Sequence, residues 1–91
     1  MSDTFVDTTP RRLLVDGRDP FADETVNVSD SSLLSIAAPD ADGKVFGTAI
    51  ANGAVSVTVD PGAADVNRTQ GSDDVTISLP AVTTPLVVSF E

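Results

Sequence analysis

The stretch FGTAIANGAVSVTV, residues 46–59, decides the expected fold of this chain. Apolar residues alternate with small or polar residues on both sides of Asn52 and Gly53, a pair that favours two-residue hairpin turns. Such a turn predicts an antiparallel hairpin in which opposed residues point to the same face. The expected pairs on its apolar face are Ile50 with Val55, Thr48 with Val57, and Phe46 with Val59. The sequence therefore predicts that this hairpin contributes one face to the core.

Alternation with a period of two also appears outside the hairpin. We expect further strands at residues 11–16, 25–29, 32–38, 74–80 and 85–91, with turn residues between them. The nearest helical candidate, residues 62–71, has glycine at both ends and a thin apolar face. Roughly six to seven short strands predict an all-β fold, a small antiparallel β-sandwich or partly open barrel that is immunoglobulin-like.

The chain divides into two parts by composition. Residues 1–24 hold three of the four arginines and one strand-like run, so we expect an extended N-terminal arm there. Residues 25–91 carry the other strand patterns and are expected to form the β-domain. The longest expected connection is loop 61–73, and loops of that length in compact domains are usually functional or mobile.

The missing residue types exclude most catalytic and metal chemistry. The 91 residues include no His, Cys, Trp or Tyr. A hydrolytic triad would lack its usual base, and thiolate or imidazole metal sites cannot form. We therefore expect no enzyme activity, no catalytic or metal-binding residues and no cofactor.

The motif DADGK, residues 40–44, resembles part of a calcium loop. Ala38 and Ala49 stand where an EF-hand needs oxygen ligands, so that motif is excluded. We expect an Asp/Gly turn there and leave open a looser cation site at Asp40 and Asp42.

Asp73 and Asp74 form a second acidic motif. Adjacent residues on a strand point to opposite faces, so these two carboxylates are not expected to act on one atom. We interpret them as the charged start of a strand that discourages edge-to-edge pairing. The sequences NVS, 27–29, and NRT, 67–69, match the glycosylation pattern, but no secretory signal accompanies them.

The net charge is −9, because 14 acidic residues, twelve of them Asp, stand against five basic ones. This balance excludes a free nucleic-acid binder, which needs a basic surface. An ordinary acidic protein and a protein adapted to concentrated salt both fit, since at about 1 M salt the screening length is only about 3 Å. No apolar run reaches the roughly 18 residues of a membrane span, and the first residues lack secretory features. We expect no membrane partner and synthesis in the cytoplasm.

The arm supplies the candidate interaction residues. Phe5, Arg11, Arg12 and Phe21 place aromatic and guanidinium groups on a segment with few core residues. Arg pairs with carboxylates, and both residue types are enriched at protein interfaces. We expect these four residues to contact acidic neighbouring subunits. The alternative is that the two arginines only flank a strand of their own domain and that the arm is disordered.

The Asp-rich, Lys-poor composition, the arm MSDTFVDTTPRRLLVDGRDPF and the β-patterns at 43–60 and 74–91 resemble small structural proteins of tailed viruses that infect haloarchaea. The resemblance covers the whole chain without a shared motif, so it carries no residue roles. It implies a non-enzymatic virion subunit adapted to high salt, such as a capsid decoration, turret or tail component. Its partners would be capsid or tail proteins and further copies of itself in a symmetric assembly.

A cellular immunoglobulin-like or carbohydrate-binding β-domain is the alternative. Sugar-binding faces usually offer exposed Trp or Tyr rings for stacking. The chain has neither residue, which counts against this alternative.

Overall fold

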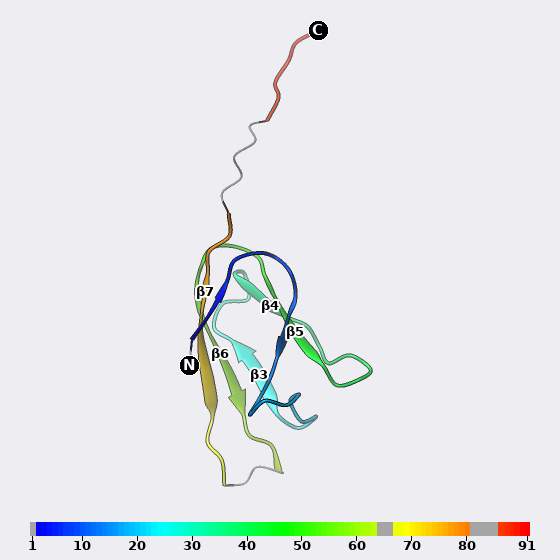
Figure 1. The fold of residues 1–91 in the computed structure, drawn as a ribbon, viewed down its shortest axis with the longest axis vertical. Helices are drawn as coiled ribbons and strands as arrows, with labels where there is room; N and C mark the ends of the chain where they lie inside the picture. Colours follow the sequence, from blue (N-terminus) through cyan, green and yellow to red (C-terminus); the bar gives the residue numbers. More distant parts are fainter. Residues whose placement is uncertain (1, 64–66, 81–85) are drawn as a thin grey trace.

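The computed structural model describes residues 2–63, 67–80 and 86–91 (Figure 1). In this part of the chain seven strands lie in two sheets, and no α-helix occurs. The strands are β1 (Ser2–Phe5), β2 (Arg11–Leu13), β3 (Thr25–Val28), β4 (Leu34–Ile36), β5 (Val45–Ala49), β6 (Gly53–Asp60) and β7 (Gly71–Ile77). The predicted fold class is confirmed: the protein is all-β, and its two open sheets form a small β-sandwich.

The strand order is β1-β7-β6-β3 in one sheet and β2-β5-β4 in the other. Neighbouring strands are antiparallel except β1 and β7, which run parallel. Only β4–β5 and β6–β7 are consecutive strands within one sheet, so the other connections cross between the sheets. Immunoglobulin-type sandwiches share this order, with strands B, E and D facing C, F and G. The likeness describes the fold alone, because such sandwiches carry unrelated functions.

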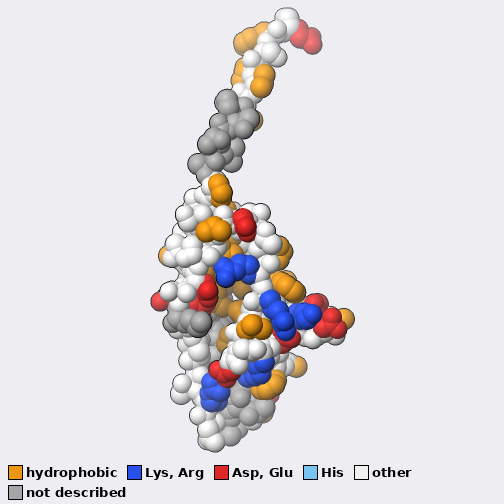
Figure 2. Space-filling view, viewed as in Figure 1, with side chains coloured by type: hydrophobic (Ala, Val, Ile, Leu, Met, Phe, Trp, Pro, Cys, Tyr) orange, Lys and Arg blue, Asp and Glu red, His pale blue; other side chains and the backbone are white. Residues whose placement is uncertain are grey.

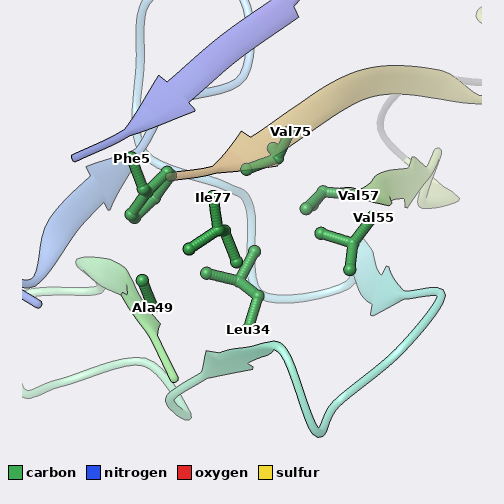
Figure 3. Packing of buried hydrophobic residues seen from close by; sticks show 7 residues of the cluster. All are labelled: Phe5, Leu34, Ala49, Val55, Val57, Val75 and Ile77. Carbon is green, nitrogen blue, oxygen red and sulfur yellow. The ribbon is translucent and has the colours of Figure 1, made fainter. Parts of the chain in front are cut away.

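The core lies between the sheets and is built from side chains at alternating strand positions. Its buried cluster consists of Phe5, Leu34, Ala49, Val55, Val57, Val75 and Ile77 (Figure 3). Both sheets contribute to it, and Leu34 is the most buried of its large side chains, with 1% exposed. Most of these residues are small, so the core of this short chain is modest.

The hairpin predicted over residues 46–59 is wrong. β5 pairs with β2 and β4, whereas β6 pairs with β3 and β7, so the two strands lie in different sheets. Asn52 and Gly53 carry the chain from one sheet to the other. The expected core pair is split, because Val55 is buried while Ile50 is 52% exposed.

Residue parity explains this outcome. A two-residue turn at 52–53 sets odd-numbered residues of one strand opposite even-numbered residues of the other, so odd residues of both strands cannot share a face. The odd-numbered residues that are buried are Val45, Gly47 and Ala49 in β5, and Val55 and Val57 in β6. A crossover lets both sets face the same core. The Ile50 amide donates to the Leu33 carbonyl at 2.8 Å, and the Leu79 amide donates to Asn52 Oδ1 at 2.7 Å.

Two glycines permit this arrangement. At Gly53, φ is +155°, and an added Cβ would lie 2.7 Å from Leu33 Cδ1. At Gly47, an added Cβ would lie 3.2 Å from Ile36 Cδ1. The missing side chain at Gly47 therefore leaves room for larger residues of β1 and β4, which explains why the smaller face of β5 is the buried one.

The first part of the chain belongs to the sandwich. β1 pairs with β7, and β2 pairs with β5, so each sheet takes an edge strand from residues 1–24. This differs from the expectation of an extended arm at 1–24 beside a β-domain at 25–91. The short strands β1 and β2 carry too little pattern to be assigned to opposite sheets from sequence.

The last strands also differ from expectation. β7 covers Gly71–Ile77 and not 74–80, which shortens the expected loop 61–73. Residues 86–91 form no strand, so the expected strand at 85–91 is wrong over those residues. Residues 64–66 of the helical candidate 62–71, and residue 85, lie outside the described part of the chain.

Candidate interaction site

The four residues predicted to contact neighbouring subunits lie in three different settings: the core, the edge strand β2 and the loop after it. The Phe5 ring belongs to the core cluster and is only 7% exposed, so it cannot serve as an exposed anchor. Phe5 pairs with Ile77 where β1 lies along β7, and this strand position turns its ring inward. Arg11 and Arg12 lie on β2, whereas Phe21 lies in the loop that follows.

Arg11 joins the edge strands of the two sheets. Its Nη1 donates to the Thr4 carbonyl at 2.8 Å, and its guanidinium lies 4.6 Å from the centre of the Phe5 ring. The nearest Asp3 carboxylate oxygen is 3.8 Å from Nη2, a long and exposed ion pair. An exposed pair of this kind contributes little stability, so Arg11 acts here mainly as a bridge from β2 to β1.

Arg12 forms a closer, two-point contact. Its Nε and Nη2 donate to the two carboxylate oxygens of Asp19 at 2.7 and 2.6 Å. This hydrogen bonding lowers the pKa of Asp19 and raises the pKa of Arg12. The contact ties the start of β2 to the loop after it.

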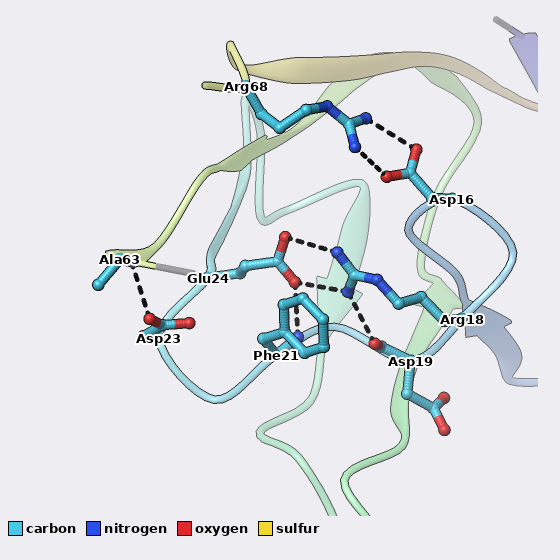
Figure 4. Close-up of polar contacts among 8 residues, drawn as sticks. All are labelled: Asp16, Arg18, Asp19, Phe21, Asp23, Glu24, Ala63 and Arg68. Carbon is cyan, nitrogen blue, oxygen red and sulfur yellow. Dashed lines mark hydrogen bonds and ion pairs between the residues drawn. The ribbon is translucent and has the colours of Figure 1, made fainter. Parts of the chain in front are cut away.

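A third arginine, Arg18, holds together the loop between β2 and β3 (Figure 4). Its guanidinium donates to both carboxylate oxygens of Glu24, at 2.9 and 3.3 Å, and lies 3.5 Å from the centre of the Phe21 ring. The Glu24 carboxylate also accepts the Phe21 amide. Phe21, still 42% exposed, is therefore held by its own loop, with its ring against a cation.

The same loop is tied to the residues that follow β6. Arg68 pairs with Asp16 at 2.7 Å and lowers the pKa of that carboxyl. The Ala63 amide donates to Asp23 Oδ2 at 2.9 Å, as Figure 4 also shows. The loop between β2 and β3 and the residues that follow β6 thus form one polar end of the sandwich. Sequence reasoning missed this end, because nothing in the pattern indicates which Asp meets which Arg.

The DADGK motif forms the expected turn. Asp40 Oδ1 accepts the amides of Asp42 and Lys44, both at 2.9 Å, and Gly43 takes a positive φ of 79°. The carboxylate therefore satisfies backbone donors of its own turn. Over the described residues, no three His, Asp or Glu side chains gather in a way that could hold a metal ion. The same residues include no helix that could cross a membrane.

A cleft of about 400 Å³ opens between the sheets beside their edge strands β1 and β2. Its lining includes three core residues, Phe5, Leu34 and Val57, and the partly buried Leu13 and Ile36. The cleft is also lined by five charged residues: Asp3, Arg11, Arg12, Asp16 and Asp73. Figure 2 shows hydrophobic side chains in a hollow flanked by basic and acidic ones. The cleft thus reaches the margin of the core, although its three core residues are at most 7% exposed.

The Asp73 carboxyl lies at this cleft beside Asp3. Its Oδ1 is buried and accepts no hydrogen bond from the described residues. Burial, followed by the effect of the neighbouring Asp3 carboxyl, raises the pKa of Asp73 from 3.8 to about 6. Asp74 is exposed on the other face, where its Oδ1 accepts the Ser56 hydroxyl at 3.4 Å. The two carboxylates are separated as expected, although both lie inside β7 and not at its start.

Residues 86–91, with the sequence LVVSFE, form an exposed segment that we call the apolar segment. In Figure 1 it lies beyond the sandwich, at the far end of the long axis. Leu86, Val87, Val88 and Phe90 are between 81% and 96% exposed. Contiguous apolar surface of this kind usually marks a place where another molecule binds.

The chain matches no protein-family model, no curated protein and no solved structure.

Proposed function

We propose that this protein is a non-enzymatic structural subunit that binds neighbouring protein subunits in a symmetric assembly. The setting we propose is the virion of a tailed virus of haloarchaea, where the chain would be a capsid decoration, turret or tail component. Its partners are capsid or tail proteins and further copies of itself, and it is made in the host cytoplasm.

The observation that carries this proposal is the apolar segment. Four large hydrophobic side chains within six residues are left in water, although the core of the same chain is short of large residues. Burying each such side chain against a partner would contribute about 1.5–3 kcal/mol before the entropy of ordering is subtracted. A repeated assembly multiplies contacts of this size, since each added subunit is held by several neighbours.

The charge of the chain supports a setting of concentrated salt. At low salt, copies that each carry a net charge of −9 repel one another. At molar salt that repulsion is screened within a few Å, while apolar contacts persist. We therefore expect assembly in high salt and release when the salt is removed. The resemblance in composition and pattern to structural proteins of haloarchaeal tailed viruses points to the same setting.

The test is gradient sedimentation of the chain from particle preparations at high and at low salt. The free chain has a mass of 9.3 kDa, so binding to a particle moves it far down the gradient. We expect it in the particle fraction at high salt and at the top after dialysis. The variant with Leu86, Val88 and Phe90 all changed to Ser should stay at the top, whereas Val87→Ser should still sediment. A wild-type chain that stays at the top at every salt concentration would refute the proposal.

A further inference from the structure

The cleft beside β1 and β2 is a place where the sandwich lacks a strand. β1 covers only half of β7, because Ser2 to Phe5 pair with Asp74 to Ile77. Within the described chain, residues 71–73 of β7 pair with β6 alone. On the facing sheet, the edge strand β2 is three residues long, and Leu14, which follows it, is 50% exposed. The cleft runs along both of these incomplete edges.

The apolar segment has the dimensions and the pattern of the missing strand. Six extended residues span about 20 Å, and the side of the cleft formed by β2 and the residues after it, 11–16, is also six residues long. Alternation sets Leu86, Val88 and Phe90 on one face. That face matches the apolar lining of the cleft, and strand addition to an open sheet edge is a common mode of binding.

The charges of the two surfaces are compatible. The apolar segment carries one charged residue, Glu91, so it can approach an acidic molecule with little repulsion. Arg11 and Arg12, two of the five basic residues in the chain, stand at the cleft. Because Asp3, Asp16 and Asp73 line the same cleft, the apolar side chains of the segment, and not its single carboxylate, carry the match.

The position of the segment favours the cleft of another molecule. The Leu79 amide is bonded to Asn52, which fixes the exit of the chain at the crossover end of the sandwich. The cleft extends in the opposite direction, towards Asp16 and Gly71. In Figure 1 the apolar segment points away from the sandwich, so entry into its own cleft would need a reversal that entry into a neighbour does not.

We propose that the apolar segment of one copy lies as an added strand along β2 in the cleft of a second copy. Leu86, Val88 and Phe90 face the apolar lining of the cleft, which includes Leu13, Leu14 and Ile36. This inference rests on the proposed function and names the chain itself as one of its partners. The contact joins two different surfaces of the chain, so it closes as a reciprocal pair or a ring, or continues as a row of copies.

The chain contains no cysteine, so single cysteines can report this contact by disulfide cross-linking. One full-length variant carries Val88→Cys, and the second carries Leu14→Cys at the cleft. Ile50→Cys is the matched control, because Ile50 is as exposed as Leu14 but does not line the cleft. In high salt we expect mixed disulfides with Leu14→Cys to form about tenfold faster than with Ile50→Cys. Equal rates would overturn the inference.

Two further variants identify the contact more closely. Adding Phe90→Ser to the Val88→Cys chain should slow the cross-link, whereas adding Val87→Ser should not. In the double variant Leu14→Cys/Val88→Cys, we expect disulfides between copies. A disulfide formed mainly within one chain would overturn the second copy as the occupant.

The cross-linking experiment and the sedimentation experiment test the two proposals separately. If the chain sediments with particles but shows no preferred cross-link, the inference fails and the proposed function stands. If the cross-link forms but the chain never enters a particle fraction, the proposed function fails and the contact between copies remains.

Discussion

Placing the same charged residue at Ala49, the last residue of β5, and at Ile50, which follows it, tests which face of that strand is buried. Ala49 is 3% exposed within the core cluster, whereas Ile50 is half exposed at the crossover. At pH 7 an Asp buried at position 49 must take up a proton, which costs 1.36 kcal/mol for each pH unit above its ordinary pKa of about 3.9, or about 4 kcal/mol. A neutral carboxyl without a partner adds about 1–3 kcal/mol.

The expected loss for Ala49→Asp is therefore about 5–7 kcal/mol, against a total stability of about 5–15 kcal/mol for a typical domain. Ile50→Asp removes only about half of the burial of one side chain and should cost about 1 kcal/mol. For a domain of this size, 1 kcal/mol lowers Tm by about 4–8 °C. We expect Ala49→Asp to be unfolded or nearly so at pH 7, and to regain stability as the pH is lowered towards 4.

Scanning calorimetry in high salt measures both variants, and it suits a chain without Trp or Tyr. The comparison decides between the crossover and the hairpin, because the hairpin register buries Ile50 and leaves Ala49 on the outer face. If Ile50→Asp lowered the stability as much as Ala49→Asp, the conclusion that Ala49 faces the core and Ile50 faces solvent would be refuted.

Three further predictions follow from single features of the structure. Burial raises the folded-state pKa of Asp73 to about 6, so the folded protein binds this proton more tightly than the unfolded chain. The free energy of unfolding should consequently fall as the pH rises from about 4 to about 6. The variant Asp73→Asn should flatten this part of a profile of Tm against pH. Gly62→Ala would push the exposed Asp23 carboxylate away from the Ala63 amide and should cost about 1 kcal/mol in urea unfolding, the net value of that hydrogen bond, while Gly71→Ala, which meets open space, should be nearly neutral. Deleting residues 86–91 should leave Tm within about 2 °C, because their large side chains are almost fully exposed; a larger drop would mean that they pack on the sandwich.

The sequence was sufficient for the fold class and insufficient for the pairing of strands. Period-two alternation correctly predicted strands near 25–28 and 53–60, and the Asp40 turn followed from its Asp and Gly residues. Alternation says which residues share a face, but it does not say which strand lies alongside. In the run 45–50 either face could be buried, since Val45 and Ala49 alternate with Phe46 and Ile50. Which face is buried depends on contacts with residues far away in sequence, such as Leu33, whose carbonyl accepts the Ile50 amide.

The prediction of an exposed Phe5 fails for a related reason. The few apolar residues of its segment favour an interface there, but a short edge strand needs only one or two inward side chains to join a core. The apolar segment presents the opposite case, since it has a strand pattern but pairs with no strand of its own molecule. Every other strand-like run of the described chain is satisfied by a neighbour within the fold. An alternating pattern is therefore evidence for a partner strand, and where the pattern stays unpaired within its own molecule, it directs attention to the open edge of a second one.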